Sequence, residues 1–261
     1  MMRVEQTEHC TLYLGDCLGV LPTLGKVDAV VTDPPYGETS LEWDKTVEWL
    51  PRAVDVLLDS GSIWVFGTLR HLMSLEFRSC GLAMSQDVIW EKHNGTNCFT
   101  DRFRRVHEQA AQFYKVGKWN SVFKKPLFTN DATAKTVRRK NRPPQWGDIG
   151  GSSYESFDGG PKMMRSVMFC RSCHGYAEHP TQKPVDVIVP LIEYSTDTRG
   201  TILDPFMGSG TTGVASVRTD RKFIGVEKEL KYFDVAIRRI EEAENERKTE
   251  LASACTGVPQ C

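Results

Sequence analysis

Short apolar segments rich in β-branched residues alternate with longer amphipathic segments along most of the chain. Between residues 11 and 114 this pattern predicts helices over TVEWLPRAVDVLL and TLRHLMSLEF and five strands, TLYLGD, VDAVVTD, GSIWVFG, QDVIW and EQAAQFY. Further on it predicts a helix over 184–196, the strand TILD, the helix TTGVASVR, the strand KFIGVE and a final helix from Leu230 to about Lys248. Strands that alternate with helices build a parallel sheet with crossover helices, so the predicted fold class is α/β with a mostly parallel sheet.

The periodicity fades over residues 115–178, where Gly, Pro, Ser, Asn and Arg dominate and aromatic residues are isolated. A structureless loop of this length is uncommon inside a domain, so the segment is expected to be a functional insertion with an irregular fold of its own. The predicted organisation is one domain made of residues 1–114 and 179–248, interrupted by this insertion. Residues 249–261 are expected to form a flexible tail.

The charge balance excludes a protein that is basic over its whole surface. The 261 residues carry a net charge of -1, so any contact with nucleic acid must be local, and KTVRRKNR at 135–142 is the candidate; a solvated face explains that run equally well. Eight scattered cysteines and no basic-then-apolar leader favour a cytoplasmic protein with reduced thiols. No segment approaches the roughly 18 apolar residues that a membrane span needs, so no membrane is expected.

A glycine-rich turn joins the strand TILD to the helix that follows it. Gly208, Gly210 and Gly213 spell G-x-G-x-x-G, and Glu227 ends the next strand, close to the spacing of a ribose-binding acid. Glycines let the backbone approach a ligand closely, so the turn predicts a nucleoside-cofactor site. Asp204, which opens the turn, would repel a pyrophosphate and suit a cationic amino-acid group. Close packing of the helix on the strand would also explain the three glycines.

The strand VDAVVTD ends in Asp33-Pro34-Pro35-Tyr36. Two prolines fix φ and supply no N–H, so the carbonyl groups there are rigidly aimed. The Asp33 carboxylate and the Pro34 carbonyl can accept the two N–H groups of an exocyclic amine on a base, which makes the nitrogen lone pair available, and the carboxylate stabilises the positive charge that develops. Tyr36 offers a ring on which a flipped base can stack. The alternative is a strand-to-loop turn that prolines punctuate.

Three motifs together resemble a known family. Asp33 to Tyr36, HPTQKP at 179–184 and Asp204 to Gly210 are similar, in this order, to the circularly permuted beta group of amino-group DNA methyltransferases, and they span nearly the whole chain. The resemblance implies a Rossmann-like fold with a circularly permuted motif order, S-adenosyl-L-methionine as cofactor and methylation of a flipped base in double-stranded DNA. It also implies a possible cognate restriction endonuclease and leaves open whether the protein is a monomer or a homodimer.

The resemblance also implies roles for individual residues. Asp33, Pro34, Pro35 and Tyr36 would be catalytic, and Lys183 has the charge to approach the cofactor carboxylate. The residues expected to bind the cofactor are Asp16, Thr181, Gln182, Lys183, Asp204, Phe206, Gly208, Gly210 and Glu227. In the insertion, which stands where the group carries its target-recognition region, the residues expected to meet phosphates or guanine edges are Arg138, Arg139, Lys140 and Arg142.

Helix capping is an alternative explanation for some of these residues. Asp16 equally suits the N-cap of a helix over CLGVL. Thr181, Gln182 and Lys183 suit the capping of the next helix, with Pro184 in its first turn.

Several questions of substrate and class stay open. Asp rather than Ser at position 33 resembles the adenine-methylating members, so adenine N6 is predicted, with cytosine N4 as the alternative. Trp90 faces either the flipped base or the core. Lesser alternatives are an NAD-type oxidoreductase, supported only by the glycine motif, and a catalytically inert nucleic-acid-binding module. The C-x-x-C-H run from Cys170 to His174 matches a haem-attachment motif, but haem attachment requires export and no leader is seen. It also matches half of a zinc site, in which Cys170, Cys173 and His174 or His179 would crowd, so no metal is expected.

Overall fold

The computed structural model describes residues 3–37, 44–96, 100–101, 103–139, 152–173, 175 and 177–256. The chain divides into two units, of which the larger comprises Met1–Lys125 and Ser166–Cys261 and the smaller comprises Pro126–Arg165. In the part of the chain described, no helix has both the length and the apolar character needed to span a membrane.

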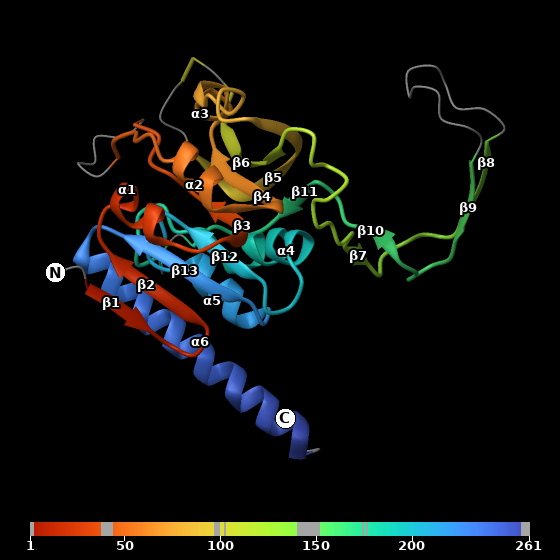
Figure 1. Cartoon of the computed structure of the whole chain (residues 1–261). Coiled ribbons are helices and arrows are strands. Elements are labelled where there is room, and N and C mark those ends of the chain that lie inside the picture. Colours follow the sequence, from red (N-terminus) through yellow and green to blue (C-terminus); the bar gives the residue numbers. More distant parts are fainter. Residues whose placement is uncertain are drawn as a thin grey trace. The chain divides into compact units, whose positions relative to one another are not determined.

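The larger unit is built on a nine-stranded sheet (Figure 1). Its strands, in spatial order, are β1 (Arg3–Gln6), β2 (Cys10–Leu14), β13 (Lys222–Glu227), β12 (Thr201–Asp204), β3 (Val27–Thr32), β4 (Leu57–Gly67), β6 (Arg105–Lys115), β5 (Leu82–Thr96) and β11 (Val167–Phe169). The five strands from β2 to β4 are parallel to one another. The β1 strand and the β5–β6 hairpin are antiparallel additions, and β11 pairs parallel to β5. The mostly parallel α/β sheet is therefore confirmed.

Helices cover both faces of this sheet (Figure 1). The first layer contains α1 (Cys17–Val20), the 3-10 helix Leu21–Thr23, α2 (Leu50–Val56) and α3 (Leu69–Ser74); the second contains α4 (Val185–Ser195), α5 (Thr211–Arg218) and α6 (Leu230–Thr256). Successive residues of a strand point to opposite faces, so in β4 Trp64 packs under the second layer while Ile63 and Val65 pack under the first. Strands buried on both faces explain why these segments read as continuous apolar runs.

Several elements differ from the sequence prediction. The helix expected over 46–58 is confined to Leu50–Val56, because β4 already begins at Leu57. The strands QDVIW and EQAAQFY form an antiparallel hairpin, since the segment between β5 and β6 is too short for the crossover that parallel pairing requires. The last helix continues to Thr256, so the expectation of a flexible tail from residue 249 is wrong as far as residue 256.

The smaller unit contains two separate antiparallel ribbons. The first pairs β7 (Phe128–Thr129) with β10 (Lys162–Met163), and the second pairs β8 (Lys135–Arg139) with β9 (Ser152–Ser156). These elements agree with an insertion of irregular fold, but its limits are narrower than the predicted 115–178. The residues on either side of the smaller unit belong to the larger unit, where β11 extends the main sheet.

Candidate active site

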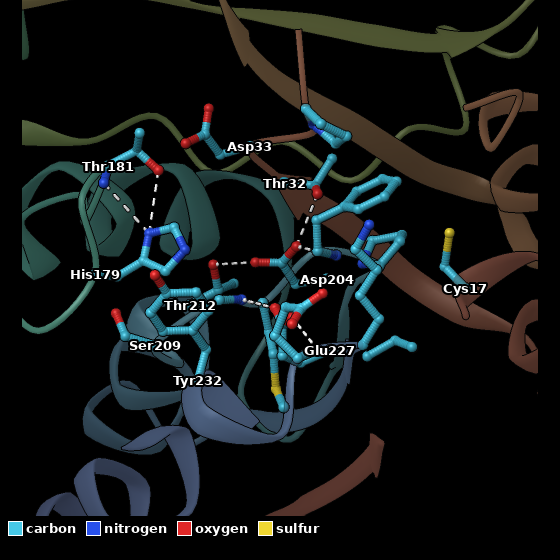
Figure 2. Close-up of a pocket in the computed structure, with 18 of the residues that line it drawn as sticks. Cys17, Thr32, Asp33, His179, Thr181, Asp204, Ser209, Thr212, Glu227 and Tyr232 are labelled. Carbon is cyan, nitrogen blue, oxygen red and sulfur yellow. Dashed lines mark hydrogen bonds between the residues drawn. The ribbon is translucent and has the colours of Figure 1, made fainter. Parts of the chain in front are cut away.

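A pocket lies where the carboxyl ends of the parallel strands meet (Figure 2). Asp16 follows β2, Asp33 follows β3, Asp204 ends β12 and Glu227 ends β13, and all four line this pocket. We call it the first pocket. Open α/β sheets bind ligands in this position because the loops that leave adjacent parallel strands diverge there. The sequence prediction that the Asp-Pro-Pro-Tyr loop and the glycine turn lie together is confirmed.

The glycine turn combines a ligand-facing bend with close helix packing. Gly208 (φ +50°) and Gly210 (φ +79°) both adopt the left-handed conformation that favours glycine. Gly208 lines the first pocket, whereas a Cβ on Gly210 would lie 2.9 Å from the Cβ of Ala236 in α6. A Cβ on Gly213 would lie only 2.5 Å from Ile240 Cδ1. Close packing therefore explains Gly210 and Gly213, whereas Gly208 faces the first pocket.

Glu227 braces this turn from the next strand. Its Oε2 accepts a hydrogen bond from the Gly208 backbone N–H at 3.0 Å, and its Oε1 accepts one from the Glu229 N–H at 2.8 Å (Figure 2). Burial raises the pKa of this carboxyl although both N–H groups stabilise its charged form. Glu227 thus faces the first pocket as a fixed acceptor, which suits the ribose hydroxyls predicted for it.

Asp204 ties together the elements that form the floor of the first pocket. Its Oδ1 accepts from Thr32 Oγ1 at 2.7 Å and from the Phe206 N–H at 3.0 Å, and its Oδ2 accepts from Thr212 Oγ1 at 2.7 Å (Figure 2). Burial raises its pKa to about 6 despite these donors. The residue joins β3, β12 and α5 in addition to lining the pocket, a role that the sequence did not predict.

Asp16 is the N-cap that the sequence allowed, and its role in cofactor binding stays a prediction. Its Oδ1 accepts from the Leu18 N–H at 2.8 Å as the N-cap of α1, and the residue also lines the first pocket. By contrast, the capping role for Thr181, Gln182 and Lys183 is wrong. The N-cap of α4 is Pro184 and no side chain caps this helix, so Pro184 also lies just before the first turn instead of within it.

The HPTQKP segment contributes three polar side chains to the first pocket, those of Thr181, Gln182 and Lys183. Gln182 Oε1 accepts from Ser209 Oγ at 3.2 Å, which joins this segment to the glycine turn. The segment also contributes His179, which the sequence analysis did not assign to the cofactor site. Its ring centroid lies 4.2 Å from that of Tyr232 in α6, and burial lowers its pKa to about 4, so the imidazole is neutral near pH 7.

Lys183 pairs with the residue expected to be catalytic. Its Nζ forms an ion pair with Asp33 Oδ2, while the Tyr36 hydroxyl donates to Asp33 Oδ1. Burial raises the pKa of Asp33, whereas Lys183 opposes that shift. Tyr36 also contacts His71, with ring centroids 4.6 Å apart. The carboxylate of Asp33 is thus held in place by donors on both oxygens.

Glu108 is a charged residue of this site that sequence reasoning missed. It lies in β6, where its Oε2 is 3.2 Å from Lys183 Nζ and its Oε1 pairs with Lys92 of β5. Burial acts to raise its pKa, but the charges of Lys183 and Lys92 prevail and lower it to about 2. The sequence held one signal for it, an acidic residue at the start of the apolar segment EQAAQFY. The partners of Glu108 could not be predicted, because they depend on the register of the hairpin.

A second pocket adjoins the first at the Asp-Pro-Pro-Tyr loop. All four residues of that tetrapeptide line it, together with Trp90, Lys92, Asn94 and Glu108 from the hairpin. Asp33, Pro35, His179 and Thr181 to Lys183 line both pockets. Asp33 therefore stands at the boundary between two cavities that belong to the same unit.

Trp90 is both a core residue and part of the wall of the second pocket. It is buried, its Nε1–H donates to the Cys170 carbonyl at 2.8 Å, and Lys92 Nζ lies 4.5 Å from its ring centroid. Cys170 and Cys173 are free thiols, and Cys173 is buried. His174, the third residue of the suspected metal motif, lies outside the described residues.

The basic residues of the insertion lie in the smaller unit. Arg138 is exposed on β8, and Arg139 ends the same strand. Lys140 and Arg142 lie outside the described residues. Their contact with DNA stays a prediction.

Comparisons with known proteins identify the family of this chain. A family model described as DNA methylase matches residues 27–238. Type II methyltransferase M.HinfI of Haemophilus influenzae is 30% identical, over 93% of this chain and 72% of the relative. Type II methyltransferase M2.MboI of Moraxella bovis is 26% identical, over 94% of this chain and 92% of the relative.

Solved structures show the same fold. The M1.HpyAVI–SAM complex has 25% identity and a TM-score of 0.62, covering 88% of this chain and 99% of its own. The cytosine-N4-specific PvuII DNA methyltransferase has a TM-score of 0.62 at 16% identity, covering 92% of this chain and 93% of its own, so it shares the fold alone. With a family model that matches most of the chain, and motifs that converge on one site, this chain belongs to the DNA methylase family of N6 and N4 amino-group methyltransferases.

Proposed function

We propose that this protein transfers the methyl group of S-adenosyl-L-methionine to the N6 amino group of adenine in double-stranded DNA, with the target base flipped out of the helix. The observation that carries the proposal is the position of Asp33 between the two pockets. The first pocket would hold the cofactor and the second would admit the base. Base flipping is required because the amino group is inaccessible inside the duplex.

The residues of the first pocket fit the cofactor. Gly208 brings backbone to the pocket wall without a side chain, and Glu227 offers carboxylate oxygens for ribose hydroxyls. Asp16 lies where an adenine amino group or a hydroxyl can donate to it, and Asp204 adds negative charge at the floor, which suits a cationic amino-acid group. When bound, the cofactor supplies an electrophilic methyl group on a sulfonium sulfur.

Asp33 and Pro34 would prepare the target nitrogen. The Asp33 carboxylate accepts one N–H of the amino group and the Pro34 carbonyl accepts the other, which turns the nitrogen lone pair away from the ring. As the nitrogen–carbon bond forms and the sulfur–carbon bond breaks, positive charge develops on nitrogen and the Asp33 carboxylate stabilises it. The surplus N–H proton leaves along the hydrogen bond to Asp33 and passes to solvent. Tyr36 provides a ring beside the base in the second pocket.

Replacement of Asp33 tests the chemistry. Asp33→Asn keeps the size of the side chain but removes its charge, so methyl incorporation into DNA should fall by about 10²-fold or more. Cofactor affinity should stay close to that of the wild type. Asp59→Asn is the matched control, because Asp59 lies on the surface and lines neither pocket. Methyl transfer at the wild-type rate by Asp33→Asn would exclude the proposed role.

The choice of adenine is supported by aspartate at position 33, which is similar to the adenine-methylating members of the family. The test is to incubate plasmid DNA with the enzyme and the cofactor, digest it to nucleosides and identify the product by mass spectrometry. N6-methyldeoxyadenosine is expected; N4-methyldeoxycytidine would overturn the choice of base and leave the family unchanged.

The two curated relatives are both named type II methyltransferases, which supports a cognate restriction endonuclease as a biological partner. Plasmid isolated from cells that express this chain should then resist one such nuclease. Sequencing of the modified positions would identify the protected site.

A further inference from the structure

Lys183 lies between two carboxylates, and only one of them has a place in the proposed chemistry. Its Nζ pairs with Asp33 Oδ2 and lies 3.2 Å from Glu108 Oε2. Glu108 Oε1 in turn pairs with Lys92. The four side chains therefore form a chain of alternating charges, Lys92, Glu108, Lys183 and Asp33, whose formal charges cancel.

The hairpin holds Glu108 at this point. Glu108 lies opposite Trp90 in the β5–β6 register, and Lys92 reaches it from two residues further along β5. The Lys92 Nζ also lies over the Trp90 ring, so this cation is fixed from two sides. Glu108 lines the second pocket but not the first. Its carboxylate is thus fixed at the pocket proposed for the base. It contacts Lys183, and it can influence Asp33 through that residue.

The ion pair with Lys183 reduces the negative charge that Asp33 can offer to a substrate, and Glu108 counteracts this effect. Both of its oxygens already have donors, the Tyr36 hydroxyl on Oδ1 and Lys183 on Oδ2. A carboxylate that neutralised Lys183 alone would retain little negative charge to stabilise a positive target nitrogen. Because Glu108 lies within ion-pair distance of the same ammonium group, the charge of Lys183 is divided between two carboxylates.

We propose that Glu108 is a positioning residue for methyl transfer: by sharing Lys183 with Asp33, it keeps negative charge and an accepting lone pair on Asp33 available to the target amino group. The inference rests on the proposed function and adds a residue to it.

The electrostatics of Asp33 agree with this arrangement. Burial raises the pKa of Asp33, Lys183 lowers it, and the Glu108 charge raises it further. The other ionisable groups that face Asp33 are the Tyr36 hydroxyl and, from β12, the buried Asp204. Removal of the charge at Glu108 would leave Lys183 to act on Asp33 alone and would lower the pKa of Asp33.

Glu108→Gln tests the inference, because it retains the shape of the side chain and removes the charge. Single-turnover methyl transfer at saturating cofactor and DNA should slow by about tenfold or more. Affinity for S-adenosyl-L-methionine, measured by calorimetry, should change by less than about twofold. The acid limb of the pH–rate profile should move to lower pH, since Asp33 ionises more readily without its neighbouring carboxylate.

Glu244→Gln is the matched control. Glu244 is also a buried carboxylate, it accepts from Thr7 Oγ1 at 2.7 Å and from the His9 N–H at 3.0 Å, and it lines neither pocket. This variant should keep the wild-type rate and pH profile even if its thermal stability falls. Because Lys92 and Lys183 each keep another contact, Glu108→Gln should unfold no earlier than the control in a thermal melt.

Three results would overturn the inference: a wild-type rate in Glu108→Gln, an acid limb that does not move, or a fall in rate matched by an equal fall in cofactor affinity. The failure of the proposed function looks different, because then the wild-type enzyme itself would place no methyl group on DNA. An active wild type with an equally active Glu108→Gln would reject the positioning role alone.

Discussion

Asp33 follows β3 and Asp204 ends the neighbouring parallel strand β12, and both line the same pocket, yet their surroundings give them different tasks. Asp33 is partly exposed at the boundary of two pockets, and its partners are a phenol and an ammonium group. Asp204 is buried and accepts from two threonine hydroxyls and one backbone N–H. A carboxylate that faces a cavity can meet a substrate, whereas one enclosed by protein donors mainly fixes the strands around it.

The buried Asp204 should give the fold a distinct pH dependence. Its pKa is raised to about 6, above its value in an unfolded chain, so the folded state binds this proton more tightly. The resulting stabilisation is fully present below about pH 4 and is lost as the pH rises to about 6; it amounts to about 3 kcal/mol. Asp204→Asn cannot lose a proton, so its free energy of unfolding relative to the wild type should increase across this window.

Urea unfolding followed by circular dichroism between about pH 4 and pH 8 measures this difference. The gap between Asp204→Asn and the wild type should change mainly between about pH 4 and pH 6 and stay constant above about pH 7. A gap that is independent of pH would show that Asp204 has a similar pKa in the folded and unfolded chains.

The motif residues could be predicted from sequence because their chemistry is local. Asp33 to Tyr36 and Gly208 to Gly210 each act through a few consecutive residues that leave a strand, so their spacing carries the information. Glu108 is a lone acid without an informative spacing. Its pairing with Lys92 depends on the register of a hairpin, and Lys183 comes from a distant segment. The hydrogen bonds accepted by Asp204 could not be predicted for the same reason, since one of the donors, Thr32, is 172 residues away.

At the scale of elements, the central parallel strands and the helices α4 and α5 were predicted closely. Segments buried on both faces of the sheet, such as β3 and β12, have an apolar pattern that few other structures produce. The helix at 46–58 was overextended because Leu57 and Leu58 continue the apolar pattern of the helix, although the chain enters β4 at Leu57. β6 runs antiparallel to β5 because the connection between the two strands is short. The apolar pattern of the two strands alone does not reveal their relative direction.

The packing of α6 against the glycine turn can be measured with two alanine variants. Gly210 (φ +79°) and Gly117 (φ +76°) have the same backbone strain, but a Cβ meets Ala236 at 2.9 Å in the first and open space in the second. Gly117→Ala should therefore cost about 1 kcal/mol from strain. Gly210→Ala should cost a further 1–3 kcal/mol, roughly, from overpacking, and it should also weaken cofactor binding.

Thermal and chemical unfolding of both variants checks this comparison, with cofactor titration as the second readout. Equal decreases in stability in the two variants would mean that α6 moves away from the turn without cost. In that case the contact between Ala236 and Gly210 does not hold the turn.

Arg239 gives α6 a polar contact with the same turn. Its Nη1 donates to the Ser209 carbonyl at 2.6 Å and to Ser209 Oγ at 2.9 Å. Removal of these charge-assisted hydrogen bonds in Arg239→Ala should loosen the turn and weaken cofactor binding by about tenfold. Arg218→Ala is the control, because Arg218 forms an exposed pair with Glu246 and exposed pairs contribute little. Calorimetric titration of both variants would refute the contact if their affinities were the same.

At the scale of the whole molecule, charge is divided unevenly between the two units. Residues 126–165 contain seven Lys and Arg residues against four Asp and Glu residues, a net charge of +3 in a chain whose net charge is -1. The larger unit contains both pockets and carries the remaining negative charge. A DNA-binding protein gains most of its sequence-independent affinity from phosphate contacts, which require local positive charge. We therefore expect phosphate contacts to come from the smaller unit, whereas both pockets belong to the larger unit.

This division predicts that DNA affinity and cofactor affinity can be separated by mutation. Alanine at Arg138, Arg139, Lys140 and Arg142 should weaken DNA binding, and the slope of log K against log salt concentration should decrease by about 0.9 for each phosphate that is no longer neutralised. Affinity for S-adenosyl-L-methionine should not change, because all residues that line the first pocket belong to the larger unit. The control replaces four cations of the larger unit that line neither pocket, Arg3, Arg218, Lys222 and Lys248. The net charge of the two proteins is then the same, so an equal decrease in slope in both would assign DNA binding to overall charge and not to the insertion.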